Sequence, residues 1–225
     1  MEKIESFIRN PQETTFEILL EGIFDVNKLS PLWFYSNKLL GKEEAENVNE
    51  KKFEENIERT FSTKFIDFKI TKDKIFVGVI DLKLYDLLID LIISISTALK
   101  NSINCFYINL FLHYTSDSSS SKKNILLKSL NMDLWNQIIE NPFSASCRIH
   151  DKFTGENYNH VRTFNTAGCT RENLKHPYHI FVFNNFTFDN SRIKINEILT
   201  QDFIIKKLNA TIKLVNNYYK LFNNG

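Results

Sequence analysis

Apolar residues recur along this chain in short blocks that favour strands and in two longer stretches with helical spacing. The segments Phe65–Ile70 and Lys74–Ile80 flank the turn Thr71–Asp73, so they predict a β-hairpin. Further strands are predicted over 16–24, 105–114, 146–153, 158–166 and 178–188. Gly22 marks a candidate bulge in the first of them.

The two stretches with helical spacing cover residues 84–100 and 193–222. In each, apolar side chains return every three or four positions and give a wide apolar face that is suited to lying on a sheet. Residues 42–59 are acidic and are expected to form a polar helix or an extended arm. We therefore predict a single α+β domain over residues 1–225, with a largely antiparallel sheet packed against two long helices. Its two halves are loosely alike, each a hairpin followed by a helix.

The composition is that of a globular protein and carries little information about chemistry. Hydrophobic residues make up 43% of the 225 residues and charged residues 24%, with a formal net charge of +1. A charge so close to zero offers few phosphate contacts, so a nucleic-acid partner is not expected. The apolar run 87–99 is too short and too polar to span a bilayer, the first residues lack a signal-peptide core, and three cysteines are an odd number. We expect a cytoplasmic location, no membrane contact and no cofactor.

Histidine and cysteine are concentrated in the region Cys147–His179. If zinc were bound there, its ligands would be Cys147, His160, Cys169 and His176. However, Cys147 and His150 are three positions apart on a predicted strand, so their side chains are expected on opposite faces. We therefore predict no stably bound metal, and retain a zinc site or a hydrolase or nuclease centre in this region as the alternative.

Polar residues on predicted central strands are the best candidates for a binding site. Asn109 and His113 share one face of a strand, and Asn184 or Asn185 comes from another. Buried amides must be hydrogen-bonded. Either they bond to backbone at an irregularity in the sheet, or they line a pocket, in which case Asn109, His113 and Asn185 are the binding residues.

Two aromatic residues near the N-terminus, Trp33 and Phe34, follow Pro31, which can start a helix. They are interpreted either as core anchors or as part of an exposed apolar surface that docks a partner.

Several short segments resemble a family of uncharacterised bacterial proteins to which no activity is assigned. The similar segments include Phe16–Phe24, the step Leu29-Ser-Pro-Leu-Trp-Phe, the strand Tyr107–Tyr114 and the closing strand Val182–Phe188. The chain departs from the family pattern by having Tyr107 in place of a glycine and Phe186 in place of a histidine. The resemblance implies a binding or structural role rather than a catalytic one.

Taken with the absence of a coherent catalytic motif, these features predict a non-enzymatic binding or assembly protein. We expect it to act on a protein partner or as a homo-oligomer, as one component of a bacterial multi-protein system of the defence or toxin–antitoxin type. The acidic first quarter and the basic lysines after residue 193 are the charged surfaces such contacts would use. The alternative is a hydrolase or nuclease that uses the Cys147–His179 region, with or without zinc.

Overall fold

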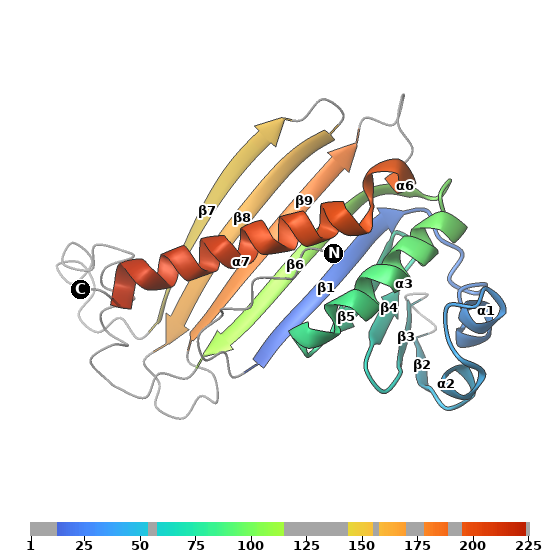
Figure 1. The fold of residues 1–225 in the computed structure, drawn as a ribbon. Coiled ribbons are helices and arrows are strands. Elements are labelled where there is room, and N and C mark those ends of the chain that lie inside the picture. The colour runs from blue at the N-terminus through green and yellow to red at the C-terminus, as the bar shows by residue number, and fades with distance from the viewer. Residues whose placement is uncertain are drawn as a thin grey trace.

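An antiparallel sheet of nine strands runs through the part of the chain that the structure describes, and the two longer helices lie on the same face of it (Figure 1). The computed structural model describes residues 13–53, 58–114, 144–154, 158–169, 178–188 and 195–223. The strands are β1 Glu13–Gly22, β2 Asn49–Phe53, β3 Glu58–Ser62, β4 Asp67–Ile70, β5 Lys74–Val79, β6 Ile103–Tyr114, β7 Ser144–Thr154, β8 Tyr158–Cys169 and β9 Tyr178–Phe188. The helices are α1 Pro31–Ser36, α2 Lys42–Glu46, α3 Tyr85–Ala98, α6 Ile195–Ile198 and α7 Gln201–Asn223, and a 3₁₀ turn, Leu82–Leu84, precedes α3.

The topology is nearly symmetric about the antiparallel pair β1 and β6. The strand order is β2-β3-β4-β5-β1-β6-β9-β8-β7, so each of the two central strands pairs on its outer side with the last strand of a three-stranded meander. Each meander is followed by a helix on the same face, α3 in the first half and α7 in the second (Figure 1). The extra strand β2 extends the first half by one.

Alternation along the strands assigns every side chain to one of two faces. Phe16, Ile18 and Leu20 of β1 point toward the helices and are fully buried. Their register partners on β6 are also buried and apolar, which makes this helix-covered face the main hydrophobic core. The helices α3 and α7 bury the periodic apolar stripes that the sequence shows.

The short helix α1 extends this core over the first meander. Ser30 caps it by accepting a hydrogen bond from Trp33 N at 3.2 Å, and Pro31 occupies the first turn, where its missing N–H costs nothing. Phe34 is fully buried and meets Phe61 and Phe68 edge to face at ring-centroid distances of 5.5 and 5.1 Å. Phe61 and Phe68 stack on each other across β3 and β4.

The α+β class, the antiparallel sheet and the hairpin at residues 65–80 are confirmed. The prediction of two long helices is wrong for 193–222, because α6 and α7 are separate helices and α7 begins only at Gln201. The acidic segment 42–59 is neither one helix nor an arm: it forms α2, then β2 and the start of β3. Arg59 of β3 is buried and forms an ion pair with Glu50 of β2 at 2.7 Å. Because the two charges are paired across the sheet, both residues can lie in strands.

Replacing Leu91 of α3 by alanine should destabilise the protein by about 2–5 kcal/mol, because this side chain is only 6% exposed and its loss leaves a cavity. The control is Leu87→Ala on the same helix, where the leucine is 44% exposed and the cost should stay below about 1 kcal/mol. Urea unfolding measures both. Equal losses for the two variants would contradict the burial of the α3 stripe.

Gly22 ends β1 at a point where two backbones approach closely. The register between β1 and β6 shifts between Glu21 and Gly22, which confirms the predicted bulge. Gly22 N donates to Asp73 O at 2.9 Å, and Ile23 N donates to Ser102 O at 2.8 Å. A Cβ on Gly22 would lie 1.8 Å from that same carbonyl oxygen, so any side chain here must break the bulge.

Gly22→Ala should therefore cost more than about 2 kcal/mol of unfolding free energy, since backbone must move. Gly78→Ala is the matched control, because a Cβ there meets Glu17 Cβ at 3.4 Å and Phe16 O at 3.7 Å, both ordinary contacts. Its effect should lie within about 1 kcal/mol of wild type. Thermal unfolding of both variants, compared with wild type, checks the difference.

Candidate functional site

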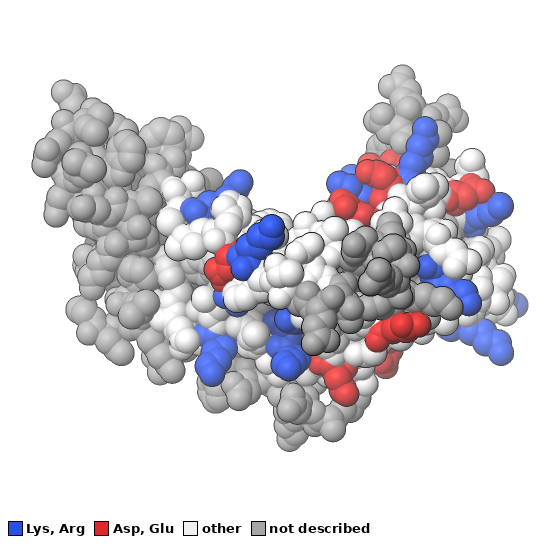
Figure 2. Space-filling model, turned by 90° about the horizontal axis from the view of Figure 1, so that it is seen from above, with Lys and Arg blue, Asp and Glu red and all other residues white. Residues whose placement is uncertain are grey.

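The face of the sheet opposite α3 and α7, called here the open face, is hollowed. Figure 2 looks along the sheet, and the described surface on this side dips toward its middle, where it is made mainly of uncharged residues. No described helix lies on this face (Figure 1). Its side chains come from the alternate positions of β5, β1, β6 and β9, and five partly buried aromatic residues are among them: Phe76, Tyr107, Phe111, Phe181 and Phe183.

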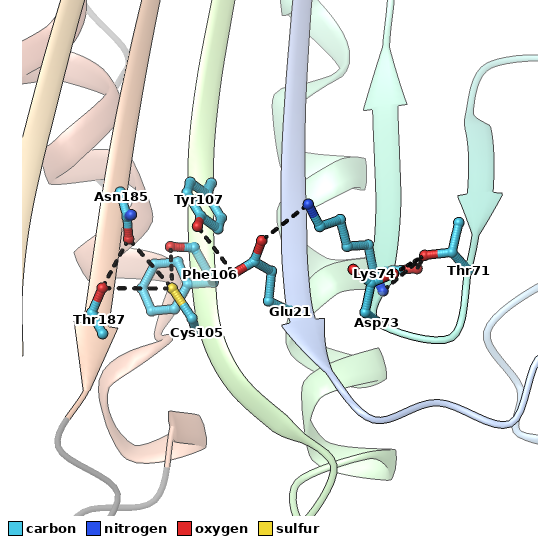
Figure 3. Close-up of polar contacts among 9 residues, drawn as sticks. All are labelled: Glu21, Thr71, Asp73, Lys74, Cys105, Phe106, Tyr107, Asn185 and Thr187. Atoms are coloured by element: carbon cyan, nitrogen blue, oxygen red, sulfur yellow. Dashed lines mark hydrogen bonds and ion pairs between the residues drawn. The ribbon is translucent and has the colours of Figure 1, made fainter.

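A row of polar groups crosses four strands at one end of the open face (Figure 3). Lys74 of β5 lies 3.3 Å from a carboxylate oxygen of Glu21 on β1, and the other oxygen accepts the hydroxyl of Tyr107 at 3.0 Å. On the far side of β6, Cys105 Sγ lies 3.0 Å from Phe186 O and 3.3 Å from Asn185 Oδ1. The row therefore ties the Glu21 carboxylate, the Tyr107 hydroxyl and the Cys105 thiol to neighbouring groups of the protein.

The thiol and the phenol of this row are held in their neutral forms. Burial raises the pKa of the Cys105 thiol to about 11, with the nearby charge of Glu21 adding to the effect. Burial also raises the pKa of Tyr107 well above its usual range, and the neighbouring Cys105 and Glu21 act in the same direction. A thiol with this pKa is not a nucleophile near neutral pH, because the thiolate is the reactive species.

At the centre of the open face, Asn109 donates from Nδ2 to Glu17 Oε1 at 2.8 Å. Burial raises the pKa of Glu17, and the hydrogen bond from Asn109 opposes that rise. Asn109 is only 4% exposed, yet its Oδ1 has no hydrogen-bond donor in the described part of the chain. A buried acceptor without a donor is uncommon and costs free energy, so a donor that reached this atom after its neighbours moved apart would gain a hydrogen bond.

The other end of the open face is aromatic. Phe111 meets Phe181 and Phe183 edge to face at centroid distances of 4.9 and 5.4 Å. Next to them the rings of His113 and His179 lie 6.2 Å apart on paired positions of β6 and β9. Burial lowers the pKa of His179, and the charge of His113 lowers it further, so a neutral imidazole is favoured here.

The structure places Asn109, His113 and Asn185 on the open face but does not bring them to one point: Asn185 pairs with Tyr107 and His113 with His179, six register positions away along β9, about 20 Å. Asn184, the alternative to Asn185 in the sequence, points the other way and is buried under α7. Sequence reasoning missed Glu17, Glu21 and Tyr107. The signal for the two glutamates was the alternation of β1, where they occupy positions of opposite parity to the buried Phe16, Ile18 and Leu20.

Trp33 and Phe34 do not form an exposed docking surface. Phe34 is fully buried in the aromatic cluster of α1, β3 and β4, and Trp33 is partly buried with its ring edge to face against Phe34 at 5.1 Å. The exposed residues of α1 are their neighbours Leu32 and Tyr35. The reason is helical geometry: on this short helix the two aromatic side chains face the first meander.

Of the candidate zinc ligands, the two whose side chains the structure describes, Cys147 and His160, are not brought together. Cys147 pairs with Thr166 and His150 with Thr163, so the two side chains point to opposite faces as expected from their spacing. Cys147 and His160 share a face, but they are six register positions apart, about 20 Å along the strands. Cys169 ends β8, and His176 lies outside the described residues. Within the described ranges no group of three histidine, cysteine or carboxylate side chains is placed to hold a metal ion.

His160 has a different role from metal binding. It is buried, and its Nε2 lies 3.2 Å from Asn184 Oδ1. The Asn184 amide also bonds to Ile108 O and Thr211 Oγ1, both at 3.1 Å, and so ties β8, β9, β6 and α7 together.

No protein-family model matches this chain, and a comparison with curated proteins finds no similar sequence. None of the helices in the described segments is long and apolar enough to cross a membrane. The resemblance to the bacterial family therefore stays a prediction, and the site rests on geometry.

Cys105 should alkylate slowly in the folded protein. With Cys147 and Cys169 replaced by serine, reaction with iodoacetamide at pH 8 should be about two orders of magnitude slower than for a thiol of ordinary pKa, because the pKa lies near 11. The variant that keeps only Cys147, which is partly exposed, should react faster.

The neutral Cys105 thiol stabilises the fold in full below the pKa of the unfolded thiol, and this contribution is lost as pH rises through about 11. Fast labelling of Cys105 at pH 8 would contradict its burial.

Proposed function

We propose that this protein is a non-enzymatic binding protein that holds a partner protein on the open face of its sheet. The observation that carries the proposal is the unsatisfied, buried Oδ1 of Asn109 at the centre of a hollow face with partly exposed aromatic rings. Aromatic side chains around a few fixed polar groups are typical of the centre of protein interfaces. Because this oxygen is covered, an N–H of the partner reaches it only after the neighbouring side chains move apart.

A protein partner fits the charge of this face better than a nucleic acid does. Glu17 lies near its middle and Glu21 at one end, where Lys74 is paired with it, so phosphates would meet carboxylates rather than free cations. The chain as a whole has a formal net charge of only +1. Protein recognition needs no excess of charge.

The chemistry of the open face supports binding rather than catalysis. The Cys105 thiol is protonated at neutral pH, and the described polar groups bond mainly to one another. The alternative of a hydrolase or nuclease in the Cys147–His179 region gains no support from the geometry, because Cys147 and His150 face opposite ways. A role as one component of a multi-protein system agrees with a surface built to hold a partner.

The test is a photo-crosslinking experiment with the aromatic amino acid p-benzoylphenylalanine, expressed in the native host. Placed at Phe183 on the open face, the probe should form crosslinks to a protein. Placed at Tyr35, which is 41% exposed on α1, it should form none above background. Mass spectrometry identifies the captured chain, and light scattering of the pure protein shows whether it is a second copy.

A crosslink from Tyr35 but not from Phe183 would overturn the open face as the site and move the interface to α1. Crosslinks to nucleic acid alone, or a strict monomer without any captured protein that turns over a small substrate, would overturn the binding-protein proposal itself.

A further inference from the structure

A pocket of about 230 Å³ lies on the other side of the sheet, between β7, β8, β9 and α7. Figure 1 shows α7 crossing these strands, and the pocket opens beside it. Its walls include Phe153, Tyr158, His160, Arg162 and Lys207. It is separate from the open face, because all these strand residues are on the positions that point toward α7.

The pocket sits at the end of a stack of four rings that crosses the sheet. Phe106, Phe186, His160 and Phe153 occupy one register line on β6, β9, β8 and β7. Neighbouring ring centroids are 4.9, 4.4 and 5.4 Å apart, with interplanar angles of 22, 16 and 27°. The inner rings are buried, and the last, Phe153, is 48% exposed. The stack therefore presents an aromatic surface at the pocket.

Hydrogen bonding fixes the tautomer of His160 inside this stack. Thr211 donates its hydroxyl to Lys207 O at 3.0 Å, so its oxygen accepts from Asn184 Nδ2. Ile108 O can only accept, which confirms that the nitrogen of the Asn184 amide points that way. Asn184 Oδ1 must then accept from His160 Nε2–H, and Nδ1 is left as an acceptor.

The imidazole is also kept neutral. Burial lowers the pKa of His160, the hydrogen bond to Asn184 opposes this, and the charges of Lys207 and Arg162 lower it further. His160 thus acts as a flat, uncharged ring between two phenylalanines.

The two cations of the pocket, Arg162 and Lys207, differ in what they contact. Arg162 is bound to Asp151 through Nε and Nη2, which neutralises it. Lys207 Nζ lies 5.6, 5.5 and 5.3 Å from the ring centroids of Tyr158, Phe186 and Phe203. Within the described residues it has no ion pair with a carboxylate, so the rings hold the ammonium without neutralising it.

We propose that this pocket binds a small organic anion, a carboxylate or a phosphate monoester that carries a planar ring. The anionic group pairs with Lys207, and the ring packs against Phe153 and Tyr158. A pocket of about 230 Å³ suits a compact molecule. The ammonium is held in position before the ligand arrives, so little side-chain entropy is lost on binding.

Calorimetric titration with benzoate and with phenyl phosphate tests the site. At least one of them should bind the full-length protein, and benzyl alcohol, which has the ring without the charge, should bind at least about tenfold more weakly. Lys207→Met keeps the apolar stem on the rings and removes the charge, so it should weaken binding by about tenfold or more. Lys206→Met is the matched control: Lys206 is the exposed neighbour, and its loss should change affinity by less than about twofold.

The relative affinities of benzoate and phenyl phosphate distinguish a carboxylate from a phosphate ligand. Lys207→Arg, which keeps the charge, should retain binding, and this distinguishes loss of charge from a failure of Lys207→Met to fold. The proposal is overturned if neither anion binds at about 10 mM. Equal affinity of the Lys207→Met variant and the wild-type protein, or equal losses with Lys206→Met and Lys207→Met, would also overturn it.

Discussion

The antiparallel pairing of β1 with β6 is the constraint on which the rest of the structure depends. The two strands stay in one register from Glu13 to Glu21, and each adds a meander on its outer side. Because side chains alternate along both strands, this single register decides which residues meet the helices and which meet the hollow. The register shifts at Gly22, where β1 ends, and only a residue without a Cβ fits there against Ser102 O.

The two faces solve the problem of buried polar groups in different ways. On the helix-covered face Asn184 is buried and satisfied, since it accepts from His160 and donates to Ile108 O and Thr211. On the open face Asn109 is almost as buried, but its Oδ1 has no donor among the described residues. A fully bonded amide stiffens a core, whereas an acceptor without a donor favours an incoming donor. This contrast separates a structural asparagine from a candidate for recognition.

Two neighbouring residues of β9 therefore belong to two sites. Asn184 fixes the imidazole beside the pocket under α7, and Asn185 lies on the open face near Cys105. Only the thickness of the sheet separates them, and the sites differ in chemistry. The open face has carboxylates and neutral thiol and phenol groups, while the pocket has an ammonium over aromatic rings. The chemistry suits a protein on one side and a small anion on the other.

The sequence alone predicted most of the strands, the α3 helix, the bulge at Gly22 and the opposite orientation of Cys147 and His150. These features follow from periods of two and 3.6 residues within one segment. The same alternation put Asn109 and His113 on one face. Strands β2 and β3 were not predicted from the sequence, because their charged residues find partners only across the sheet, as Arg59 does with Glu50. Three features emerged only in the folded chain: the burial of Phe34, the choice between Asn184 and Asn185, and the ring stack from Phe106 to Phe153. Each depends on the register between strands distant in sequence, and no local pattern encodes that register.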